Sequence, residues 1–108
     1  MGGGGVYWVL PGVCRIVWSV HALRRMRERG VSFEEALSAL RSPVEHVYDK
    51  SRDVYIAFDG SVAVVYAYRP PVIEVVTVMR SREYRCLIGR LSWRRYRVIQ
   101  GAPLKGRE

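Results

Sequence analysis

Residues 19–43, SVHALRRMRERGVSFEEALSALRSP, constrain the fold more than any other stretch because they predict two helices joined at one glycine. Ser19 is suited to cap the first helix, since its hydroxyl can accept a backbone N–H that has no partner within the helix. Gly30 is suited to end that helix, because glycine readily adopts the left-handed conformation found at helix C-termini. Apolar residues at helical spacing predict that the first helix is buried along Val20, Leu23 and Met26.

The second helix has equally clear ends. Ser32, with Glu35 three residues later, predicts a capping box in which each side chain accepts the other residue's backbone N–H. Pro43 prevents the helix from continuing and pushes Ser42 toward an extended conformation. The apolar spacing predicts a second buried stripe formed by Phe33, Ala36, Leu37 and Leu40.

Outside the two helices, the hydrophobic pattern changes to the alternation typical of strands. Asp59-Gly60 is a hairpin signal, and Pro70-Pro71 breaks the strand before it. The strands are predicted at residues 14–18, 45–48, 54–58, 62–68 and 72–79. Residues 81–91 predict a short helix with Ser81 as its N-cap and Tyr84, Leu87, Ile88 and Leu91 on one side.

These elements predict an α+β fold in which two N-terminal helices pack on a small antiparallel β-sheet, with a short C-terminal helix. Residues 92–100 fit either a last strand or an ordered tail. We expect a flexible glycine tail at 1–5, a single domain at 6–100 and a flexible C-terminal tail at 101–108.

Positive charge is concentrated at the two ends of the sequence. The net charge is +8, and sixteen of the eighteen basic residues are arginine. Residues 1–29 carry +4 and residues 80–108 carry +7, whereas residues 30–79 carry −3. A one-sided field attracts polyanions, and arginine favours bidentate phosphate contacts and stacking on bases. The composition therefore favours a nucleic-acid partner, although arginine-rich sequences are also typical of GC-rich or thermophilic genomes.

Several functions are disfavoured by the absence of their motifs. The sequence contains no phosphate-binding glycine loop, no H-E-x-x-H and no G-x-S-x-G, and Cys14 and Cys86 do not form a C-x-x-C pair. We therefore expect neither a metal site nor a cofactor, and we expect the two cysteines to pack as half-buried small residues. No stretch is long enough to span a membrane and no signal peptide is recognisable, which predicts a cytoplasmic protein without a membrane partner.

Arginines interleaved with aromatic residues form the remaining chemical signal. Such a set suits RNA because arginines neutralise phosphates and rings stack on unpaired bases. It also suits metal-independent cleavage, in which a 2′-hydroxyl attacks the neighbouring phosphate, arginine stabilises the charge and another group moves protons. A solvated basic surface is the third interpretation. The candidate catalytic residues are Arg80, Arg82, Tyr84, Arg85 and His21, and the candidate RNA-binding residues are Arg24, Arg25, Arg90, Trp93, Arg94, Arg95, Tyr96 and Arg97.

The segment HALRRMRERGVS resembles the H-A-x-x-R-M-x-x-R-G-[IV]-S opening of a domain-of-unknown-function family. His21, Ala22, Arg25, Met26, Arg29 and Gly30 match this opening, and the resemblance extends over roughly residues 16–80 to the strand ending VVTV. That family looks like a branch of the RelE/ParE toxin superfamily, close to BrnT-like toxins.

The resemblance implies a RelE-like sheet packed on two helices. It also implies metal-independent cleavage of RNA, frequently mRNA on the ribosome, and neutralisation by an antitoxin. Superfamily nucleases carry their functional residues on the last strands and the C-terminal segment, where Arg80, Arg82, Tyr84 and Arg85 lie here. We therefore expect a toxin-type endoribonuclease. The alternatives are a non-catalytic RNA- or ribosome-associated protein and a module that binds an acidic, antitoxin-like partner.

Overall fold

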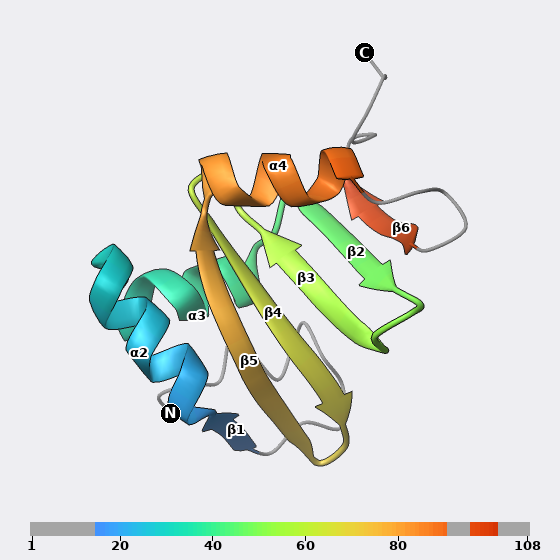
Figure 1. Ribbon diagram of the computed structural model, residues 1–108. Coiled ribbons are helices and arrows are strands. Elements are labelled where there is room, and N and C mark those ends of the chain that lie inside the picture. Colours follow the sequence, from blue (N-terminus) through green and yellow to red (C-terminus); the bar gives the residue numbers. More distant parts are fainter. Residues whose placement is uncertain (1–14, 91–95, 102–108) are drawn as a thin grey trace.

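The computed structural model describes residues 15–90 and 96–101 and has the predicted α+β class (Figure 1). Its sheet is six-stranded, with the strand order β1-β5-β4-β3-β2-β6. Three helices accompany the strands in this part of the chain. In chain order the elements are β1 (Arg15–Trp18), α2 (Val20–Arg29), α3 (Phe33–Arg41), β2 (Glu45–Asp49), β3 (Val54–Phe58), β4 (Val62–Arg69), β5 (Val72–Arg80), α4 (Ser81–Arg90) and β6 (Tyr96–Gly101).

The sheet is mixed, so the prediction of an antiparallel sheet is correct only for β2 to β6. These five strands pair antiparallel, and β2 to β5 follow one another as a meander. β1 instead pairs parallel with β5, in the register Arg15 to Val72 through Trp18 to Val75. The helices are therefore not strictly N-terminal, because β1 precedes them and holds the start of α2 at the edge of the sheet.

The predicted ends of α2 and the predicted start of α3 are confirmed. The Ser19 hydroxyl accepts a hydrogen bond from the Ala22 backbone N–H at 2.9 Å, and it donates to the carbonyl of Val76 at 3.0 Å. Gly30 has the left-handed φ of 65° that favours glycine. The Ser32 and Glu35 side chains form the reciprocal capping box. Local sequence thus defines both ends of the α2–α3 corner.

The stripes that bury these helices differ in part from the prediction. α2 contacts the sheet through Ala22 and Met26, four residues apart, while Val20 is 81% exposed and Leu23 is 39% exposed. Ala36 and Leu40 of α3 are buried as predicted, but Phe33 is half-exposed, with its ring edge against Trp18. Small alanines let the helices approach the strands closely, and this contact turns Val20 and Phe33 outward.

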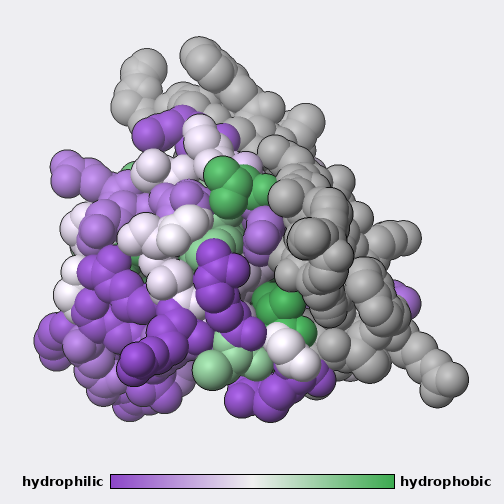
Figure 2. Space-filling view, turned by 90° about the horizontal axis from the view of Figure 1, so that it is seen from above, coloured by the Kyte–Doolittle hydropathy of each residue, from purple (hydrophilic) through white to green (hydrophobic). Residues whose placement is uncertain are grey.

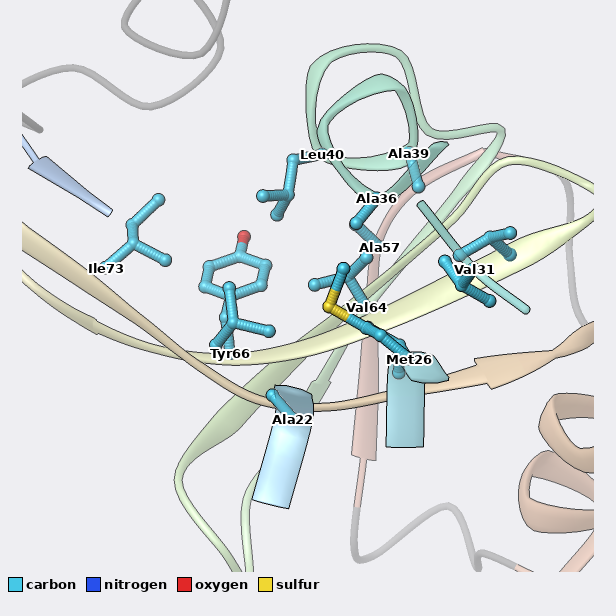
Figure 3. Close-up of a cluster of buried hydrophobic side chains, with 13 residues drawn as sticks. Ala22, Met26, Val31, Ala36, Ala39, Leu40, Ala57, Val64, Tyr66 and Ile73 are labelled. Atoms are coloured by element: carbon cyan, nitrogen blue, oxygen red, sulfur yellow. The ribbon is translucent and has the colours of Figure 1, made fainter. Parts of the chain in front are cut away.

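The two faces of the sheet have separate cores. On one face Ala22 and Met26 of α2 and Ala36, Ala39 and Leu40 of α3 surround Val64 and Tyr66 of β4 (Figure 3). On the other face, Tyr84 and Ile88 of α4 pack against buried side chains of β2, β3 and β4, namely Val47, Ile56, Phe58, Ala63 and Val65. β4 is buried on both sides, as its apolar sequence predicts.

The C-terminal part departs from the prediction in two details. α4 follows β5 without a loop, so Ser81 is the first helical residue and not the N-cap. Its start is stabilised instead by the Glu83 carboxylate, which accepts the Arg80 backbone N–H at 3.1 Å. From Tyr96 onward the chain joins the sheet as β6, and Gly101, expected in the tail, ends this strand. The expected tails at 1–5 and 102–108, as well as Leu91, lie outside the described residues.

Among the helices of the described segments, none is both long enough and apolar enough to cross a membrane.

Candidate nucleic-acid interface

Arg29 and Glu83 form an ion pair that joins the end of α2 to the start of α4. The Arg29 guanidinium donates from Nε to Glu83 Oε1 at 2.6 Å and from Nη2 to Glu83 Oε2. This hydrogen bonding raises the pKa of Arg29 and lowers the pKa of Glu83, because each group stabilises the charge of the other. The pair is partly exposed, and it attaches two helices that lie on opposite faces of the sheet.

Arg80, a predicted catalytic residue, holds the same corner from β5. Its Nε donates to the Arg29 carbonyl at 3.2 Å and its Nη2 to the Gly30 carbonyl at 2.8 Å. Its Nη1 lies 3.6 Å from Glu35 Oε2 at the start of α3. These carbonyls end α2 and have no partner within the helix. The structure therefore places Arg80 in a contact that fixes the α2–α3 corner.

Tyr84, a second predicted catalytic residue, is in the core. Its side chain is 1% exposed and stacks on Phe58 with ring centroids 4.1 Å apart. Its hydroxyl donates to Glu45 Oε1 at 2.8 Å. Arg85 is exposed, and its guanidinium carbon lies 5.3 Å from the centre of the Phe58 ring. The predicted cluster of Arg80, Arg82, Tyr84 and Arg85 is thus split, because consecutive helical residues point in different directions.

A groove of about 390 Å³ runs between α4 and β5. Arg82, Cys86 and Arg90 recur every four residues along α4 and form one wall. Arg52, from the turn between β2 and β3, also lines the groove. The apolar part of the groove surface comes from β5 and α4. The remaining lining residues are Arg29, Thr77, Val78, Met79, Glu83 and Leu87. Cys86, expected to be half-buried, is instead an exposed free thiol.

The charge of this groove is strongly positive. Arg52, Arg82 and Arg90 have no carboxylate partner among the described residues, whereas the single acidic residue in the lining, Glu83, is already paired with Arg29. Figure 2 looks down on the molecule from the side of α4 and shows hydrophilic side chains over much of this surface, with hydrophobic ones between them. Sequence reasoning included Arg82 and Arg90 but missed Arg52, because no local signal shows that this turn reaches α4.

His21 lies among arginines on α2 and not beside the groove residues of α4. Arg24 Nη2 is 3.2 Å from His21 Nδ1, and Arg25 Nε is 3.4 Å from His21 Nε2. A neutral imidazole accepts at one nitrogen only, so one of these two contacts at a time is a hydrogen bond to the ring. Arg25 also pairs with Glu28 at 2.9 Å. α2 thus carries a second basic cluster with a histidine and a carboxylate in it.

The remaining predicted RNA-binding residues are only partly placed. Trp93, Arg94 and Arg95 lie outside the described residues. Tyr96 and Arg97 belong to β6, where their backbones pair opposite Asp49 and Tyr48 of β2. In strand order β6 lies at the opposite end of the sheet from β1.

A buried histidine–tyrosine contact, which the sequence did not predict, lies on the α2–α3 face. His46 is 6% exposed, and its Nε2 is 2.6 Å from the Tyr66 hydroxyl oxygen. Burial lowers the pKa of His46 and raises the pKa of Tyr66, because both charged forms are poorly solvated there. Tyr55 stacks on Tyr66, which closes the contact within an aromatic cluster. Because the His46–Tyr66 contact is buried, it is part of the core.

In the described segments, no group of three or more histidine, cysteine or acidic residues is arranged to hold a metal ion.

The fold and the groove define a small α+β domain with an arginine-lined surface on the α4 face. Residues 18–80 match the family described as Domain of unknown function (DUF4258). This match covers more than half of the chain, so the chain belongs to the DUF4258 family. No curated protein and no solved structure matches it.

Proposed function

We propose that this chain binds RNA through the groove between α4 and β5, and that its domain is a RelE-like member of the RelE/ParE superfamily. The observation that carries the proposal is the grouping of Arg52, Arg82 and Arg90 around one groove, without a carboxylate partner among the described residues. Arginines in ion pairs are neutralised by their partners, whereas the guanidinium groups of these three remain able to bind a phosphate. The helix order, the meander and the α4 position support a RelE-like shape.

Phosphate contacts of this kind have a measurable signature. Each one releases counterions, so affinity for a single strand falls with salt at a log–log slope of about −0.7 per contact. The test is fluorescence anisotropy with a labelled single-stranded RNA over a salt series, comparing the parent with Arg82→Ala/Arg90→Ala. We expect the double variant to bind at least about tenfold more weakly, with a slope shallower by about 1.4.

The matched control is Arg15→Ala/Arg41→Ala. It removes the same two charges from exposed positions in β1 and α3 that do not line the groove. If it weakens binding as much as the groove variant, net charge and not the groove accounts for the affinity. Absence of RNA binding by the parent, together with tight binding of an acidic protein, would replace the proposal with the antitoxin-like partner interpretation.

A second candidate function is metal-independent cleavage of mRNA by a toxin-type endoribonuclease. The observation that favours it is the α2 cluster, in which His21 lies within 3.4 Å of Arg25 and Arg25 pairs with Glu28. A histidine that moves protons beside arginines that stabilise a phosphorane is the chemistry such cleavage needs. Tyr84 takes no part in this version, since its hydroxyl is bonded to Glu45 within the core.

Cleavage of a defined mRNA is tested in two reactions. In the first the mRNA is free and EDTA is present, and in the second it is being translated by ribosomes in the presence of magnesium. Attack by the 2′-hydroxyl leaves 5′-hydroxyl ends, so new ends should accept label from a polynucleotide kinase without prior phosphatase treatment. A 2′-deoxy substitution at the cut site should block the cut. Cuts that are lost in His21→Ala would support this candidate. If the RNA stays intact in both reactions while the protein sediments with ribosomes, cleavage is excluded and only the RNA-binding function remains.

A further inference from the structure

A second, smaller hollow adjoins the arginine groove. It has a volume of about 90 Å³ and lies between the sheet and α4. The two hollows share four lining residues, Arg52, Thr77, Met79 and Leu87, and therefore lie side by side. A ligand held by the arginines of the groove can extend from there into the smaller hollow.

The walls of the smaller hollow are mainly aliphatic. The aliphatic lining residues are Val54, Ile56, Val65, Val76, Met79 and Leu87, with Thr77 at the junction. Asp49 and Arg52 complete the lining. Ile56 and Val65 are buried at the bottom, with 1% and 7% of their surface exposed. Since a water molecule needs roughly 10–15 Å³ of such volume, the hollow has room for about six to nine waters. Water gains little from such walls, and a flat, weakly polar ring gains contact with them.

Arg52 is held beside this hollow by the turn that carries it. Asp49 Oδ1 accepts the backbone N–H of Ser51 at 3.1 Å and its hydroxyl at 2.9 Å. The Asp49 carbonyl accepts the backbone N–H of Asp53 at 2.8 Å. These bonds fix the backbone on both sides of Arg52. The turn therefore holds the backbone of Arg52 at the place where its side chain lines both the aliphatic hollow and the groove.

We propose that the aliphatic hollow takes the base of an unpaired nucleotide while Arg52, Arg82 and Arg90 hold the adjoining phosphates. This inference rests on the proposed function and narrows its substrate to single-stranded RNA. A duplex keeps its bases stacked inside and cannot place one between the sheet and α4. An abasic strand offers the same phosphates but nothing to fill the hollow.

The experiment compares three labelled RNAs by anisotropy at one salt concentration: a single-stranded octamer, an abasic octamer of the same charge and a blunt duplex. We expect the octamer with bases to bind about tenfold tighter than the abasic strand, on the scale of one buried base. Equal affinity of the parent for these two strands would overturn the inference, as would an equal or higher affinity for the duplex. Failure of all three RNAs to bind would instead remove the proposed function itself.

Two variants of Thr77 test whether the base binds in the aliphatic hollow. Thr77 lines both hollows, so Thr77→Phe should fill their junction, whereas Thr77→Val keeps the shape of the side chain. We expect Thr77→Phe to bring the two affinities to within about twofold by weakening only the strand with bases, and Thr77→Val to behave as the parent. A thermal unfolding curve establishes that each variant is folded. A folded Thr77→Phe protein that keeps the parent's preference contradicts the placement.

Discussion

Two sets of arginines lie near the start of α4 and along it, and they have different roles. Arg29 and Arg80 are engaged with Glu83, Glu35 and the backbone carbonyls that end α2. Arg82 and Arg90 lie along the groove wall, with no carboxylate partner among the residues that the structure describes. An arginine that is bonded to its own chain contributes to the fold, while one that faces solvent across a groove can hold a phosphate.

The two faces of the sheet show the same contrast on a larger scale. One face is covered by α2 and α3 (Figure 3). On this face the polar contact between His46 and Tyr66 is buried. Of the helices that the structure describes, α4 alone covers the other face, which leaves the groove and the aliphatic hollow beside it. We therefore expect ligand binding on the α4 face, where the helices leave part of the sheet uncovered.

The largest expected effect separates the core from the groove. Tyr84→Ala should destabilise the protein by about 3–5 kcal/mol, because it removes a buried ring and its stack on Phe58. Chemical denaturation measures this loss. Tyr84→Phe keeps the ring and loses the hydroxyl bond to Glu45, so it should cost only about 1 kcal/mol and leave RNA affinity unchanged. A stable Tyr84→Phe protein that no longer cleaves or binds RNA would return Tyr84 to the functional site.

A smaller effect should distinguish the two sets of arginines. Arg29→Ala should lower the free energy of unfolding by about 1–2 kcal/mol, because it breaks a partly exposed, bidentate pair with Glu83. Arg82→Ala should change it by less than about 0.5 kcal/mol, as is usual for an exposed side chain. Parallel urea titrations make the comparison. Equal losses in the two variants would show that the distinction between the sets is wrong.

The smallest effect is a dependence on acid. The Arg29 guanidinium holds the pKa of Glu83 below its ordinary value, so the pair contributes stability above the unfolded pKa, near 4.5. That contribution is lost as pH falls through the lower, folded pKa. Glu83→Gln should therefore be less stable than the parent at pH 7, by about 1 kcal/mol or less, and the gap should close toward pH 3. A gap that is constant with pH would mean that the hydrogen bonds and not the charge of Glu83 matter.

Local sequence predicted the elements well because their signals lie within a few residues. Ser19, Gly30 and the Ser32–Glu35 box are at the predicted helix ends, and Asp59 and Gly60 form the predicted turn. The orientation of the helices was predicted less well. Val20 and Phe33 are at correct helical spacing for a buried stripe, yet the close contact through Ala22 and Ala36 leaves them exposed.

The candidate site was only partly predictable for the same reason. Arg82 and Arg90 followed from charge and aromatic composition alone. The separation of Tyr84 from them depends on which way α4 faces, and that of Arg80 depends on its contact with the end of α2. Arg52 is about thirty residues from Arg82 in sequence and reaches the groove only because the β2–β3 turn lies on the α4 face. No pattern within a short window carries that information.

By itself, the sequence determined the α+β class, the ends of its helices and the concentration of positive charge at both ends of the chain. Each of these follows from side chains interacting with their own backbone or from simple composition. Only the tertiary structure decided that β1 pairs parallel with β5, and that Arg29 and Arg80 are paired within the fold. The tertiary structure also placed Arg52, Arg82 and Arg90 at one groove. These outcomes depend on which surfaces pack together, because packing determines which charges find partners and which remain available to a ligand.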